Sequence, residues 1–173
     1  MKETEAKDAL DAIQHARQQT SELMGYQVSG SVVAAWGVAW IIGFTAMQFV
    51  PQSAPWVWGL CWIAALGWTA TRPRAPNDTR VLATWAVAVC YVGLITAMVE
   101  ADFREASVVI AIAVASGYTI AGLWAGWRFA FLGGLVMVSA AVGWWFLPEF
   151  LFLSLGFGGG TALLLGGLWL KRP

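Results

Sequence analysis

Long stretches without a charged side chain constrain this chain more than any other feature. No Asp, Glu, Lys or Arg occurs between Glu22 and Arg72. Four further gaps follow: Arg80 to Glu100, Glu105 to Arg128, Arg128 to Glu149, and Glu149 to Lys171. A helix needs about 20 apolar residues to cross a hydrocarbon core of ~30 Å. Each later gap fits one such span and the first is about twice as long, so the pattern predicts an integral membrane protein.

The first gap is divided by Pro51 and Pro55, because two prolines so close together do not fit a helix interior. The apolar runs are continuous and do not alternate with polar residues, which favours helices over the strands of a membrane barrel. We therefore predict an all-α bundle of six transmembrane helices in residues 25–173. The predicted spans are 28–50, 55–71, 80–99, 106–126, 129–147 and 150–170.

Composition agrees with this class and argues against nucleic-acid binding. Charged residues make up 12% of the 173 residues, about half of what a soluble domain carries. Lys and Arg together number 10, as do Asp and Glu. This balance leaves no basic field to neutralise phosphates.

The distribution of Lys and Arg predicts the orientation. With the N-terminus inside, Arg104 is the single basic residue on the outer side. The other nine fall inside: Lys2, Lys7, Arg17, Arg72, Arg74, Arg80, Arg128, Lys171 and Arg172. Both termini are therefore predicted to be cytoplasmic, in a bacterial inner membrane. The carboxylates at the outer side, Glu100, Asp102, Glu105 and Glu149, are interpreted as solvated turn residues.

Most of the tryptophans fall near the predicted span ends, where amphipathic rings prefer headgroup level. Trp40 and Trp62 lie deeper, in adjacent helices of one hairpin. We expect both rings to face the bundle interior.

The six spans form three hairpins, and the first resembles the third. Glycine in the ascending helix, proline at the outer turn and two glycines in the descending helix recur at Gly37, Pro51, Gly59 and Gly67, and at Gly134, Pro148, Gly159 and Gly167. We predict an internal repeat, with chance matching among 19 glycines as the alternative. This plan resembles the HdeD-type acid-resistance membrane proteins of bacteria. The resemblance implies the six-span architecture, and we take no function from it.

Two glycine pairs are four residues apart, Gly156 with Gly160 and Gly122 with Gly126. Small residues at this spacing allow helix backbones to approach closely. We expect helix packing here, with a bent or locally open helix as the alternative for the glycine-dense stretch 156–160.

Residues 1–24 are predicted to form a cytoplasmic amphipathic leader helix, because apolar residues recur at helical spacing. Two roles stay open for it. The leader packs on the protein's own helices or the bilayer surface, or residues 3–24 dock a cytoplasmic partner.

Reactive chemistry is scarce in the sequence. The single histidine, His15, lies in the leader and cannot complete a metal site alone. Cys61 and Cys90 are interpreted as small buried apolar residues. We predict no catalytic, cofactor-binding or metal-ligating residue, and no enzyme.

The function expected from the sequence is therefore a non-enzymatic membrane protein with a structural, stress-related or regulatory role. Its expected partners are the lipid bilayer, a cytoplasmic protein at the leader, and further copies of itself. The alternative is a small channel or facilitator for a small solute. A dry, tightly packed interior favours the first role, and a polar face along a cavity favours the second.

Overall fold

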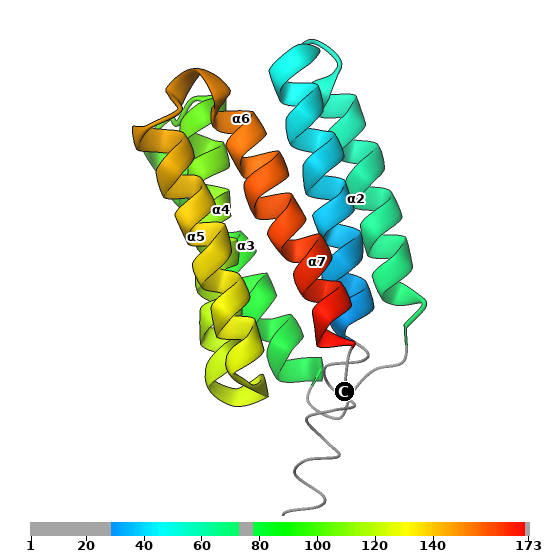
Figure 1. Cartoon of the computed structure of the whole chain (residues 1–173). Coiled ribbons are helices and arrows are strands. Elements are labelled where there is room, and N and C mark those ends of the chain that lie inside the picture. Colours follow the sequence, from blue (N-terminus) through cyan, green and yellow to red (C-terminus); the bar gives the residue numbers. More distant parts are fainter. Residues whose placement is uncertain (1–28, 73–77, 172–173) are drawn as a thin grey trace, which may run out of the picture.

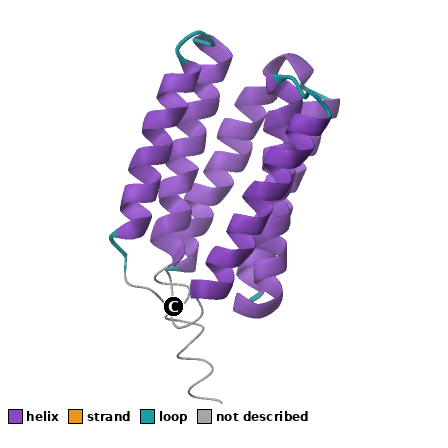
Figure 2. Ribbon diagram, turned by 180° about the vertical axis from the view of Figure 1, so that it is seen from behind, coloured by secondary structure: helices purple, strands orange, loops and turns teal. Residues whose placement is uncertain are grey.

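A computed structural model of the chain describes residues 29–72 and 78–171, and every regular element in this part is helical (Figures 1 and 2). The first helix runs over Ser29–Phe49. It is followed by α2 (Ala54–Ala70), α3 (Asp78–Met98), α4 (Phe103–Ala125) and α5 (Trp127–Trp145). The last helix, Pro148–Leu170, joins η1 (Pro148–Phe150), α6 (Leu151–Leu153), η2 (Ser154–Gly160) and α7 (Thr161–Leu170). The predicted leader 1–24, with His15, lies outside the described residues.

All six predicted spans are helices, and their bounds agree with the structure to within three residues. The largest difference is at α4, which begins at Phe103 and not at 106. Asp102 explains the earlier start. Its carboxylate accepts from the backbone N–H of Arg104 and Glu105, both at 2.8 Å, and Glu105 returns a capping-box contact.

Four of the helices are long and apolar enough to cross a membrane: Ser29–Phe49, Phe103–Leu123, Trp127–Trp145 and Pro148–Leu170. A shorter apolar helix covers Trp85–Met98. The 17 residues of α2 reach about 26 Å at 1.5 Å per residue, a little less than the hydrocarbon thickness.

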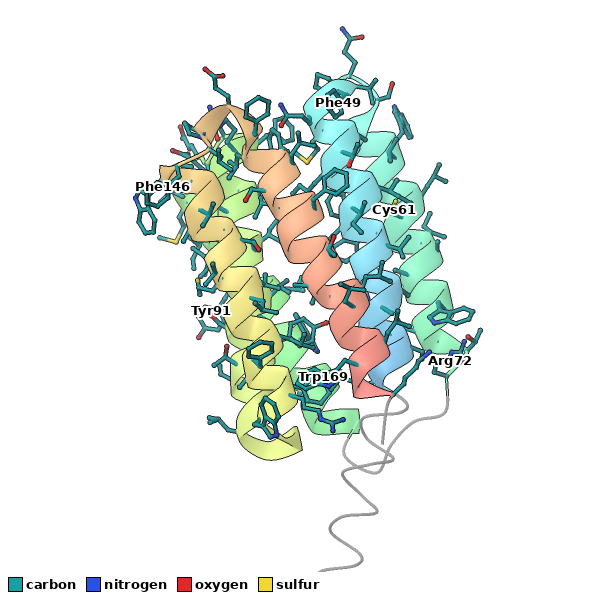
Figure 3. All side chains as sticks on the ribbon, in the orientation of Figure 1. Phe49, Cys61, Arg72, Tyr91, Phe146 and Trp169 are labelled. Carbon is teal, nitrogen blue, oxygen red and sulfur yellow. The ribbon has the colours of Figure 1, made fainter. Side chains whose placement is uncertain are left out.

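The turns separate the charges between the two ends of the bundle. Glu100, Asp102 and Glu149 lie in turns at one end, which we call the acidic end. Arg72, Arg128 and Lys171 lie at the other, the basic end. In Figure 3, Arg72 and Trp169 mark the basic end, opposite Phe49 and Phe146.

The last helix occupies the middle of the arrangement, between α5 and the first helix (Figure 1). α4 packs along α5, and α3 packs on α4. On the other side the first helix contacts α2, where Trp36 meets Trp62 edge-on with ring centroids 5.1 Å apart. Seen in this order, α5, the last helix, the first helix and α2 form a row, with α2 and α5 at its two edges.

Glycines bring the backbones of the first and last helices into contact, a region we call the glycine seam. Gly30 lies opposite Gly167, where an added Cβ would be 2.5 Å from the carbonyl oxygen. Seven residues on, Gly37 lies opposite Gly160, at 2.7 Å by the same measure. Small residues repeated every seven positions on both antiparallel helices permit this approach.

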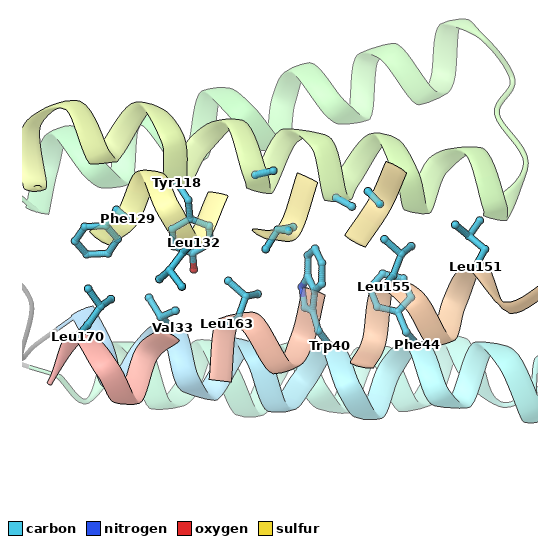
Figure 4. Close-up of a cluster of buried hydrophobic side chains, with 14 residues drawn as sticks. Val33, Trp40, Phe44, Tyr118, Phe129, Leu132, Leu151, Leu155, Leu163 and Leu170 are labelled. Atoms are coloured by element: carbon cyan, nitrogen blue, oxygen red, sulfur yellow. The ribbon is translucent and has the colours of Figure 1, made fainter. Parts of the chain in front are cut away.

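A cluster of apolar side chains fills the space between the α4–α5 pair and the first and last helices (Figure 4). Trp40 is 4% exposed and lies at the centre of the cluster, as predicted. The same prediction is wrong for Trp62, which is 42% exposed. α2 is apolar all round, so its sequence does not indicate which face turns inward. Buried core residues include Phe44, Leu132, Val136, Leu155 and Leu163.

The cysteines also differ from the prediction. Both are free, Cys90 is exposed, and Cys61 is half-buried. Both lie on helices that expose wide apolar surfaces. A small apolar side chain on such a surface can stay exposed, because lipid is itself apolar.

Candidate functional site

The most unusual backbone in the described chain is the π-helical stretch η2, Ser154–Gly160, inside the last helix. Four of its seven residues are glycine: Gly156, Gly158, Gly159 and Gly160. Glycine weakens the ordinary helix and tolerates departures from it. Stretches of π-helix occur often at functional sites, so this segment is the candidate site that the backbone singles out.

The glycines of η2 allow three neighbours to pack against its backbone. The indole of Trp40 covers Gly159, where an added Cβ would lie 3.1 Å from the ring. Phe44 contacts Gly156 in the same way, at 3.1 Å. Ser139 of α5 approaches Gly158, with 2.7 Å between its hydroxyl oxygen and an added Cβ. The close packing expected of this stretch is confirmed, and its backbone is π-helical and not an ordinary α-helix.

The two glycines of the second pair, Gly122 and Gly126, have different roles. Gly122 packs against the backbone of Ala130 in α5, as predicted. Gly126 instead forms the turn between α4 and α5, with φ 111°, a conformation that favours glycine over any residue with a side chain.

Short side-chain hydroxyls in these helices donate hydrogen bonds to backbone carbonyls. Ser154 donates to the carbonyl of Ser139 at 2.8 Å, which ties the last helix to α5. Ser139 donates to the carbonyl of Leu135 at 2.9 Å. Thr69, Thr96 and Thr119 each donate to the carbonyl four residues earlier. This is the role that the sequence predicts for short hydroxyls inside apolar helices.

The acidic end is built as a cap over the bundle. The Arg104 guanidinium donates to the carbonyl of Pro148, and Gln48 donates to the carbonyl of Glu149 at 3.0 Å. These two bonds join the start of α4 and the end of the first helix to η1, at the start of the last helix. Asp102 and Glu105 are engaged in the cap of α4. Glu100, Asp102, Glu105 and Glu149 are all exposed, as expected, but Glu105 lies in the first turn of α4 and not in the turn before it.

A shallow depression of about 420 Å³ lies beside this cap, lined by Thr96, Ala97, Ala101, Asp102, Phe103 and Ala106. It is open and mostly apolar, and its one carboxylate already caps α4. Within residues 29–72 and 78–171, no group of three His, Cys, Asp or Glu side chains lies close enough to hold a metal ion.

The basic end carries arginines over tryptophan rings. Arg72 lies 3.8 Å from the ring centroid of Trp68, and Arg128 lies 5.2 Å from that of Trp169. Such cation–π pairs are typical of an interface where aromatic rings and basic groups meet lipid headgroups.

Sequence reasoning missed two residues of this arrangement, Gly30 and Gln48. The signal for Gly30 is the seven-residue spacing to Gly37, matched by Gly160 and Gly167. Searches against protein families, curated proteins and solved structures found no match to this chain. The resemblance to HdeD-type proteins therefore rests on the glycine and proline pattern alone.

Proposed function

We propose that this protein is a six-span membrane protein of the bacterial inner membrane, with both termini cytoplasmic and a non-enzymatic structural or regulatory role. Support for the orientation comes from the charges. Arg72, Arg128 and Lys171 gather at one end of the bundle, and the acidic turns lie at the other. A basic end on the cytoplasmic side is the arrangement that membrane insertion favours.

One observation carries the choice of a non-conducting role: the centre of the bundle is filled by large apolar side chains and touching backbones. Trp40, Phe44, Val136 and Leu155 are all buried in one cluster. Buried polar side chains are few among the described residues: Ser107, whose hydroxyl donates to the carbonyl of Phe103 at 2.6 Å, and Tyr118, with the Thr45 hydroxyl also buried. A polar solute crossing this interior would lose its hydration and find few partners.

The role we propose is therefore exerted at the surface of the protein. We propose two surfaces for this role. One is the predicted leader, residues 3–24, as a docking helix for a cytoplasmic protein. The other is the membrane-facing surface, through which copies of the protein or other membrane proteins associate.

Solute flux through proteoliposomes tests the non-conducting role. Purified protein is reconstituted, and vesicle shrinkage and re-swelling are followed by light scattering after mixing with glycerol, urea or potassium chloride. We expect the same rates as in protein-free vesicles from the same lipid. Flux above that background, abolished by filling η2 through Gly158→Leu, would replace the proposal with a facilitator.

The facilitator is kept as the second candidate because of η2. Gly158 faces Ser139 of α5, and Ser154, the first residue of η2, donates across to the carbonyl of Ser139. A π-helical stretch with hydroxyls beside it is one place where a helix could rearrange to admit a polar solute.

A further inference from the structure

The glycines that the last helix contributes to the glycine seam are doubled in the sequence. Gly160 and Gly167 contact the backbone of the first helix. Each is preceded by a second glycine, Gly159 and Gly166, so that residues 159–167 have the order Gly-Gly-Thr-Ala-Leu-Leu-Leu-Gly-Gly. The same face of the first helix has single glycines, since Gly30 lies between two serines and Gly37 lies between a tryptophan and a valine.

The doubled glycines follow or belong to the π-helical stretch η2, and the first helix contains no such stretch. A π turn closes its hydrogen bonds over five residues where an α turn closes them over four, so it holds one residue more. If η2 became α-helical, every residue after it would therefore advance by one position. One position in an α-helix is about 1.5 Å along the axis and about 100° around it.

A step of one residue would leave the composition of the glycine seam unchanged. The seam side of the last helix consists of two glycines and of Leu164, whose backbone lies against Gly37. After the step each position is filled by a residue of the same kind: Gly160 by Gly159, Leu164 by Leu163, and Gly167 by Gly166. The backbones of the first and last helices can therefore stay in contact in both registers.

The side of the last helix that faces α5 would change. A Cβ added at Gly166 would overlap the side chain of Leu132, and after the step Leu165 stands at that position. Two buried positions change as well: Leu163 is replaced by Ala162, and Leu170 by Trp169. Because Leu132 lies in the basic half of α5, the larger side chain opposite it moves this half of α5 away from the last helix.

Each register therefore has one advantage over the other. The present one buries Leu163 and Leu170, both 1% exposed, and keeps Gly166 on Leu132, but it contains a π turn. The other regains regular α-helical hydrogen bonds and gives up these apolar contacts. Four of the seven residues of η2 are glycine, so few side chains have to rearrange when its backbone changes.

We propose that the last helix moves between two registers one residue apart, one with η2 as a π turn and one with it as α-helix. The two registers share the glycine seam and differ in the position of α5 at the basic end. α4 packs along α5 and moves with it. Two arrangements of one packed element, close in free energy, are the basis of a conformational switch. The inference rests neither on the orientation nor on the role proposed above.

Two disulfide pairs report the two registers. The rings of Phe131 and Trp169 have centroids 6.0 Å apart, so Phe131→Cys with Trp169→Cys reports the present register. After the step Leu168 takes the position of Trp169, so Phe131→Cys with Leu168→Cys reports the other. Both pairs are made in a background of Cys61→Ser and Cys90→Ser and are oxidised in native membranes. We expect both pairs to crosslink.

Deletion of Gly158 distinguishes a register step from simple proximity of residues 168 and 169. It removes the additional residue of the π turn, so η2 becomes α-helical while the residues after it keep their present contacts. The pair at 131 and 169 should still crosslink, and the pair at 131 and 168 should be lost. Crosslinking between 131 and 168 that is equal with and without Gly158, or absent from both proteins, would overturn the proposal.

Leu165→Ala gives a second test, which also decides the matter if the deletion variant does not fold. Leu165 is 59% exposed, so the present register loses little, whereas after the step a smaller side chain stands against Leu132. Crosslinking between 131 and 168 should therefore increase relative to that between 131 and 169. Val138→Ala, at a position of α5 that is also 59% exposed, should leave this ratio unchanged. A ratio that Leu165→Ala does not raise above the Val138→Ala control contradicts the two registers.

Discussion

Gly37 and Gly160 bring the first helix and the last helix into backbone contact, since a Cβ added at Gly37 would lie 2.7 Å from the carbonyl oxygen of Gly160. The two glycines are more than 100 residues apart in the sequence, and their contact closes hairpin one onto hairpin three. The neighbouring atoms belong to backbone, which cannot rotate away as a side chain would. The contact therefore depends on glycine at both positions.

Gly37→Leu should separate the first and last helices and destabilise the bundle. Overpacking against backbone costs about 1–3 kcal/mol or more, so we expect a clear fall in melting temperature in mild detergent. Gly59→Leu is the matched control, because nothing lies within 4 Å of a Cβ at Gly59. Equal melting temperatures for the two variants would argue against the glycine seam.

Trp40→Ala should cause a larger loss than any exposed tryptophan. The indole is 4% exposed and packs on Gly159 and Phe44. Removing a buried large side chain leaves a cavity and costs roughly 3–5 kcal/mol. Thermal unfolding followed by fluorescence-detected size exclusion measures the effect. Trp56→Ala is the comparison, since Trp56 is exposed on α2, and a comparable loss there would contradict the described core.

The bounds of the helices could be predicted because charged residues and prolines mark them directly. A charge inside a span is costly, so Arg80, Glu100, Glu105 and Arg128 delimit α3 and α4 to within a few residues. Which face of each helix packs against its neighbours could not be predicted in the same way. Where a helix is apolar on every side, hydropathy gives no inward direction, and Trp62 was misplaced for this reason.

The candidate site escaped sequence reasoning for a related reason. The glycines at 156–160 predict both close packing and a locally open helix, and only the surrounding side chains decide between them. Trp40, Phe44 and Ser139 come from two other helices, so their approach to η2 is a tertiary property that local sequence does not encode. Gly30 and Gly167 carry a readable signal, the shared seven-residue spacing, once the two helices are compared.

Gly158→Ala should destabilise the packing of the last helix on α5, because the new Cβ would lie 2.7 Å from the Ser139 hydroxyl oxygen. Ser139→Gly removes that oxygen and should rescue the variant. A double-mutant cycle of melting temperatures separates this coupling from the intrinsic effects of each change. We expect the double variant to be more stable than Gly158→Ala alone, and additive losses would show that the two residues do not meet.

Asp102→Ala should weaken the start of α4 by about 0.5–2 kcal/mol, the usual value of an N-cap. The carboxylate accepts from two backbone N–H groups, those of Arg104 and Glu105. Hydrogen exchange at these two amides should accelerate while amides in the middle of α4 stay protected. Asp102→Asn keeps an oxygen acceptor and should preserve most of the protection. Unchanged exchange in the alanine variant would place the start of α4 elsewhere.

The separation of charges between the ends leads to the prediction for topology. Nine of the ten Lys and Arg residues fall on one predicted side, and positive residues are retained on the cytoplasmic side during insertion. In a background of Cys61→Ser and Cys90→Ser, Gln52→Cys and Asp102→Cys should react with an impermeant maleimide in intact cells. Asn77→Cys should react only after the cells are opened. The acidic turn at Asp102 follows the third span, so its labelling depends on all three preceding crossings. Protection at Asp102→Cys together with reaction at Gln52→Cys would mean that α2 or α3 does not cross the membrane, and the six-span arrangement would have to be abandoned.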